Sequence, residues 1–118
     1  MTVLIVDDDP DYLVILRRLV ARRAPRAPVL LAGGALAALT IIRDDHPGLV
    51  LCDVRMPPPG SVCDVAVAGR EVGATVIAMS SVACIGPAGT RLVSKDRLPE
   101  LIDGLLATTP DARATGAR

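Results

Sequence analysis

Residues 3–10 read Val-Leu-Ile-Val-Asp-Asp-Asp-Pro, and this stretch decides the fold. Its first half is a short β-branched run that is apolar on both faces, which is typical of a strand buried between two layers of helices. Its second half ends that run with three carboxylates and a proline. Because Asp9 is a good N-cap residue and Pro10 a good first helical residue, the stretch predicts a buried strand that leads directly into a helix.

The same strand-helix unit recurs along the rest of the chain. Apolar runs predict four further strands, at residues 28–32, 48–54, 75–79 and 91–94. Helical spacing and capping patterns predict helices from Pro10 to Pro25, from Gly34 to His46, from Ser61 to Val72 and from Leu98 to Ala107. In the second helix we expect the buried stripe to consist of Leu36, Leu39 and Ile42.

Strands that alternate with helices predict a parallel sheet with helices on both faces. For five such units we expect a flavodoxin-like, doubly wound α/β fold with strand order 2-1-3-4-5, which binds ligands at the carboxyl ends of its strands. The fourth helix is expected to be short or absent, because segment 81–94 leaves only about ten residues for it, including Gly86, Pro87 and Gly89. We expect one domain at residues 1–108 and a disordered tail at 109–118.

The composition excludes several classes of function. Thirteen basic residues balance thirteen acidic ones, and Tyr12 is the only aromatic residue, so we expect no direct nucleic-acid binding. Cys52, Cys63 and Cys84 lack CxxC spacing and one histidine cannot complete a zinc site, which predicts reduced thiols in a cytoplasmic protein. No apolar run reaches the ~18 residues of a membrane span, so no membrane partner is expected. Lys95 is the only lysine beside twelve arginines.

Polar residues stand at the ends of four predicted strands: Asp7 and Asp8, Asp53, Ser80 and Lys95. Singly, the aspartates after the first strand form an N-cap cluster, the serine is a loop hydroxyl and the lysine a surface amine. Together they are expected to converge, since the ends of parallel strands meet at one edge of a sheet. Clustered carboxylates repel one another unless a hard cation lies among them, and Mg²⁺ is the cation expected. An aspartate beside such a metal can accept a phosphoryl group, with hydroxyl and ammonium donors for its oxygens.

These residues resemble the receiver (CheY-like) domain of bacterial two-component response regulators, in the pieces at residues 3–10, 53–57, 78–81 and 92–96. The resemblance implies that Asp53 is the phospho-acceptor, served by a histidine kinase or a histidine phosphotransfer protein. It implies that Ser80 is the switch hydroxyl and that Lys95 pairs with the phosphate. It also implies that Mg²⁺ is held by Asp7, Asp8, Asp53 and the backbone carbonyl of Arg55.

The same resemblance implies a signalling protein that acts on an output protein, here unknown, with a homodimer as a further candidate assembly. It implies no enzyme beyond the self-catalysed transfer to Asp53. Two departures from the family stand out: the segment 82–89 is contracted, and Leu92 occupies a position that is commonly aromatic. They favour an alternative, a degenerate receiver that binds partners independently of phosphorylation. A metal-dependent phosphatase is disfavoured, because such enzymes require a second aspartate two residues after the nucleophile, and Arg55 occupies that position.

Overall fold

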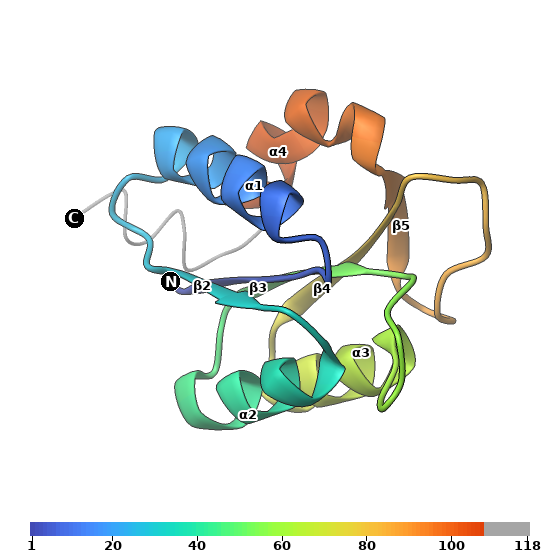
Figure 1. Cartoon of the computed structure of the whole chain (residues 1–118). Helices are drawn as coiled ribbons and strands as arrows, with labels where there is room; N and C mark the ends of the chain where they lie inside the picture. The colour runs from blue at the N-terminus through green and yellow to red at the C-terminus, as the bar shows by residue number, and fades with distance from the viewer. Residues whose placement is uncertain (108–118) are drawn as a thin grey trace.

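The computed structural model describes residues 1–107, which form a five-stranded sheet between two layers of helices (Figure 1). The strands are β1 (Val3–Val6), β2 (Val29–Ala32), β3 (Leu49–Asp53), β4 (Thr75–Ser80) and β5 (Arg91–Ser94). They run parallel in the order β2-β1-β3-β4-β5, so the predicted topology is confirmed. The tail predicted at 109–118 lies outside the described residues.

Two helices cover each face of the sheet, as Figure 1 shows. On one face lie α1 (Pro10–Arg23) and α4 (Leu98–Ala107), the latter preceded by the 3-10 turn η1 (Lys95–Arg97); on the other lie α2 (Ala35–Asp45) and α3 (Val62–Glu71). Every β1 side chain is fully buried. Val3 and Ile5 belong to the core beneath α1 and α4, whereas Leu4 and Val6 belong to the core beneath α2 and α3. This alternation explains why the β1 sequence is apolar throughout.

The predicted caps fix where α1 and α3 begin. The Asp9 carboxylate accepts the backbone N–H groups of Asp11 and Tyr12 at 3.0 and 3.4 Å. At α3, Ser61 and Asp64 form a reciprocal capping box, in which the Ser61 N–H donates to the Asp64 carboxylate at 2.9 Å. Each cap satisfies N–H groups that a helix start leaves without partners. The first turn of α1 is therefore held firmly against the aspartate run that precedes it.

The predicted buried stripe of α2 is confirmed at Ile42 but wrong at Leu36, and Leu39 is only half-buried. Its buried residues are Ala35, Ala38 and Ile42, whereas Leu36 is 54% exposed. The alanines bring this helix close to its neighbours, and the backbone at Gly60 passes so near that a Cβ built there would lie 2.7 Å from the Ala35 Cβ. Small side chains, rather than the large ones, thus form the packed face of the helix, a choice that hydrophobic spacing alone does not reveal.

Segment 81–90 contains no helix, which confirms the expectation for the fourth helix of the predicted fold. It runs as an irregular connection beside β5 (Figure 1), so the helix labelled α4 is the closing one. Arg70 of α3 donates from Nη1 to the Ala88 carbonyl at 3.4 Å, and Gly86 lies against the Leu92 side chain. Ile85 in this segment is 95% exposed.

Among residues 1–107, no helix is both long and apolar enough to cross a lipid bilayer.

Candidate functional site

Strand register brings the predicted site residues to one edge of the sheet. Val6 of β1 pairs with Cys52 of β3, so the next residues, Asp7 and Asp53, lie side by side. At the other side of the site Ser80 pairs with Ser94, and Lys95 follows directly. The carboxyl ends of β1, β3, β4 and β5 therefore each supply a polar group at the same level.

Three carboxylates form the centre of this edge. Asp7, Asp8 and Asp53 each offer an oxygen atom, and these oxygens all lie within 4.8 Å of one another. Asp7 is completely buried and Asp53 is 6% exposed, whereas Asp8 is open to solvent. The Asp9 backbone N–H donates to Asp7 Oδ1 at 2.9 Å, which fixes the orientation of that carboxylate.

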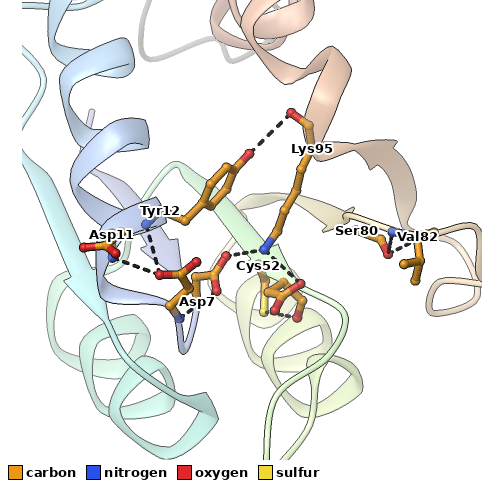
Figure 2. Close-up of polar contacts among 9 residues, drawn as sticks. Asp7, Asp11, Tyr12, Cys52, Ser80, Val82 and Lys95 are labelled. Carbon is orange, nitrogen blue, oxygen red and sulfur yellow. Dashed lines mark hydrogen bonds and ion pairs between the residues drawn. The ribbon is translucent and has the colours of Figure 1, made fainter.

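Lys95 provides the positive charge of the cluster. Its Nζ lies 2.6 Å from Asp7 Oδ2 and 3.5 Å from Asp53 Oδ1, and its side chain is 13% exposed. Figure 2 shows the lysine chain extending from the start of η1 to the Asp7 carboxylate. Three carboxylates and one ammonium leave the site formally with two uncompensated negative charges.

The surroundings shift the pKa of both charged partners. Burial, and next the neighbouring Asp7 charge, raise the pKa of Asp53, against the opposing effects of Lys95 and of the backbone N–H that Arg55 donates. Burial lowers the pKa of Lys95, but the hydrogen bond to Asp7 and the charges of Asp7 and Asp53 together leave it raised. The ammonium thus stays charged, while Asp53 becomes a more basic carboxylate than one in water.

The donor set fits a hard divalent cation. Carboxylate oxygens are the ligands that Mg²⁺ prefers, and three of them converge here with a residual negative charge and one solvent-exposed member, Asp8. Asp7, Asp8 and Asp53 are the side chains that would hold the ion. Arg55, whose carbonyl is the fourth predicted ligand, lies exposed two residues after Asp53.

Ser80 lies at the same edge but faces elsewhere. Its hydroxyl donates to the Val82 carbonyl at 2.7 Å and accepts the Val82 N–H at 3.1 Å. Figure 2 shows this pair well apart from the Asp7 and Lys95 contact. The structure therefore brings together Asp7, Asp8, Asp53 and Lys95, and it leaves the Ser80 hydroxyl engaged with the first residues of segment 81–90.

Tyr12 is a site residue that the sequence analysis did not single out. The Lys95 Nζ lies 4.4 Å from the centre of its ring. Two signals could have found it: it is the only aromatic residue of the chain, and it stands in the first helical turn after the aspartate run.

Cys52 directly precedes Asp53, and its thiol donates to the Asp53 backbone carbonyl at 3.5 Å. Its side chain is fully buried in the core beneath α2 and α3, where it packs as a small hydrophobic residue. Burial, and then the charges of Asp53 and Asp7, raise the pKa of its thiol to about 12. The thiol is therefore protonated at neutral pH.

Comparison with known proteins defines the fold. No family model matches the chain, and no curated protein matches its sequence. Solved structures do match. A response regulator receiver protein from Sinorhizobium medicae has a TM-score of 0.80 at 17% identity, covering 95% of this chain and 96% of that one. A CheY-like receiver domain protein from Methanospirillum hungatei has a TM-score of 0.77 at 19% identity, with 97% of each chain covered.

A third match, the N-terminal domain of a three-domain response regulator protein from Carboxydothermus hydrogenoformans, has a TM-score of 0.78 at 13% identity over 100% of both chains. The described residues 1–107 thus have the fold of response regulator receiver domains.

Proposed function

We propose that this chain is a phospho-accepting receiver of a bacterial two-component signal transduction system, with Asp53 as the acceptor. One observation carries the proposal: three carboxylates and one ammonium meet at the carboxyl edge of a sheet with the receiver fold. Asp53 is the member of that cluster at the centre of the edge, between the ends of β1 and β4.

The proposed step is a phosphoryl transfer from a phosphohistidine. A carboxylate oxygen of Asp53 attacks phosphorus, the new O–P bond forms and the N–P bond of the donor breaks. The bond's electron pair goes to the histidine nitrogen, and the ring leaves as neutral imidazole because its second nitrogen carries a proton.

Charge stabilisation is the main task of the neighbouring residues. Asp7 and Asp8, with Asp53 and the Arg55 carbonyl, would hold Mg²⁺, which supplies positive charge to the transferring phosphoryl oxygens when bound. Lys95, already 3.5 Å from Asp53, supplies an ammonium donor to the phosphoryl oxygens. Ser80 would donate its hydroxyl to the phosphoryl group only after leaving Val82, so its movement would alter the start of segment 81–90.

The proposed function implies particular partners and a cytoplasmic location. The donor is a histidine kinase or a histidine phosphotransfer protein, and the receptor of the signal is an output protein or a second copy of this chain. The protein is not a turnover enzyme, since its acceptor is its own side chain. The three free cysteines suit the reducing cytoplasm that the sequence predicts.

A small phosphodonor tests the proposal without knowledge of the kinase. The chain is incubated with Mg²⁺ and phosphoramidate, and its intact mass and its elution volume are measured together. We expect the wild type to gain one phosphoryl group, and Asp53→Asn or wild type in EDTA to gain none. An unmodified wild type, or an equally modified Asp53→Asn variant, would refute the assignment.

A degenerate receiver remains the second candidate. It is favoured by segment 81–90, which lacks a helix, and by the Ser80 hydroxyl, which is bonded to Val82 rather than turned to Asp53. It predicts that self-association or partner binding is the same with and without phosphodonor, and the same in Asp53→Ala. A change in elution volume on phosphorylation would rule it out.

A further inference from the structure

Tyr12 touches Lys95 at both ends of the lysine. Its ring centre lies 4.4 Å from the lysine Nζ, and its hydroxyl points to the Lys95 backbone carbonyl with an O–O distance of 3.5 Å. Figure 2 shows the ring lying along the lysine side chain, between the first turn of α1 and the start of η1. A side chain of α1 thus contacts both the backbone carbonyl and the ammonium of a lysine that lies 83 residues later in the sequence.

The lysine needs such a support. Its ammonium sits on a flexible four-carbon stem, and both of its ionic partners, Asp7 and Asp53, belong to the carboxylate cluster. A ring face attracts a cation through its quadrupole, more strongly where water is excluded, and this lysine side chain is largely buried. The ring therefore limits the ammonium to a small region next to both carboxylates.

Local structure fixes the ring in turn. The Tyr12 N–H is one of the two that the Asp9 cap accepts, so the turn that sets the Asp7 carboxylate also sets the ring. Burial, and next the charges of Asp7, Asp53 and Asp96, raise the pKa of Tyr12 to about 12. Its hydroxyl is consequently protonated at neutral pH, and the ring faces the ammonium as a neutral group.

We propose that Tyr12 is a positioning residue: its ring holds the Lys95 ammonium beside Asp7 and Asp53, at the distance needed to meet a phosphoryl group on Asp53. The ring, and not the hydroxyl, contacts the ammonium. The hydroxyl faces the Lys95 backbone carbonyl instead, and that O–O distance of 3.5 Å is long for a hydrogen bond. Phenylalanine at position 12 should therefore still hold the Lys95 ammonium in place, whereas leucine should not.

The composition makes the placement directly measurable. Lys95 is the only lysine, so ¹³C-lysine labelling gives a single ε-methylene signal, and Tyr12 is the only Phe, Trp or Tyr that could shift it. The one other ring, the imidazole of His46, ends α2 before β3 begins, at the opposite edge of the sheet. In the wild type we expect that signal upfield of its position in the unfolded chain, because the methylene is bonded to the Nζ that lies 4.4 Å from the ring centre. The shift should persist in Tyr12→Phe and disappear in Tyr12→Leu.

Leu19→Ala serves as a matched control, since Leu19 is a partly buried α1 residue that packs against the same core. It should lower the unfolding midpoint and leave the lysine signal in place. An unchanged lysine signal in folded Tyr12→Leu would overturn the proposal. So would a signal lost equally in Tyr12→Phe, which tests the ring contact even if the leucine variant fails to fold.

A second readout rests on the proposed function. In Tyr12→Leu the rate of phosphorylation by phosphoramidate should fall about two- to thirtyfold, the effect of one cation–π contact from which water is largely excluded, and Tyr12→Phe should restore it. A wild-type rate in Tyr12→Leu would overturn the positioning role. If the wild type itself takes up no phosphoryl group, the proposed function fails, and the lysine signal alone then decides the role of Tyr12.

Discussion

Replacing Lys95 by methionine removes the only ammonium of the site and keeps a side chain of similar length. The variant should be markedly less stable without divalent ions. Asp7 is completely buried and its Oδ2 lies 2.6 Å from the lysine Nζ, so the substitution leaves a buried carboxylate without its ionic partner.

The size of the effect follows from that burial. Removing one partner of a buried ion pair costs about 3–5 kcal/mol. The lower end applies here, because the lysine side chain is 13% exposed and Asp7 keeps its 2.9 Å hydrogen bond from the Asp9 N–H. A loss of about 3 kcal/mol is a large part of the 5–15 kcal/mol that stabilises a domain, and it should lower Tm by about 12 °C.

Urea unfolding in EDTA, followed by far-ultraviolet circular dichroism, measures this loss. Arg97→Met is the matched control: its ion pair with Glu100 is long, at 3.8 Å, and both side chains are about 70% exposed, so it should cost less than about 0.5 kcal/mol. Mg²⁺ should restore part of the stability of Lys95→Met. If that variant unfolds within 1 kcal/mol of wild type in EDTA, the reasoning about a buried, lysine-neutralised cluster is wrong.

The same pair predicts a pH dependence. Because the pKa of Lys95 is raised in the folded protein, its contribution is fully present below the ordinary lysine pKa of about 10.4 and is lost as pH rises through the raised value. The gap in stability between wild type and Lys95→Met should therefore be the same at pH 8 and pH 9. It should narrow only in strongly alkaline solution, and a gap that closes by pH 9 would contradict the pKa direction.

Three further predictions concern the scaffold. Ser61→Ala removes the capping box of α3 and should cost about 1 kcal/mol in urea unfolding, whereas no loss would contradict the cap. Gly69→Ala should cost about 1–3 kcal/mol, because its Cβ would meet a valine methyl of β4 at 2.6 Å; Gly104→Ala, with open space around it, should be neutral or stabilising. With a thiol pKa of about 12, Cys52 is about one part in ten thousand thiolate at pH 8, so iodoacetamide should modify exposed Cys63 in the native protein and spare Cys52, as peptide mass mapping would show.

The fold was predictable because its signals are local and agree with one another. An apolar run followed by a cap and a proline sets β1 and α1, and Ser61 with Asp64 sets the start of α3. The packed face of α2 was not predictable in the same way. Its choice of Ala35 and Ala38 over Leu36 depends on the close approach of the backbone at Gly60, which is a contact between distant segments.

The candidate site likewise has a part that local signals predict and a part that depends on contacts between distant segments. Strand ends place Asp7, Asp53 and Lys95 together, and any parallel sheet of this order would do so. The direction of the Ser80 hydroxyl and the contact between Tyr12 and Lys95 could not be predicted, because each depends on the path of another segment. For Ser80 that segment is 81–90, which runs without a helix; for Tyr12 it is the start of η1.

Chemical trapping of the modified side chain tests the central claim most directly. After incubation with Mg²⁺ and phosphoramidate, borohydride reduces an acyl phosphate on aspartate to homoserine, and tandem mass spectrometry then locates that residue in the sequence. The account predicts homoserine at position 53 alone, and none when Mg²⁺ is omitted. Homoserine at position 7 or 8 instead, or none anywhere in the wild type, would contradict the assignment of Asp53 as the phospho-acceptor.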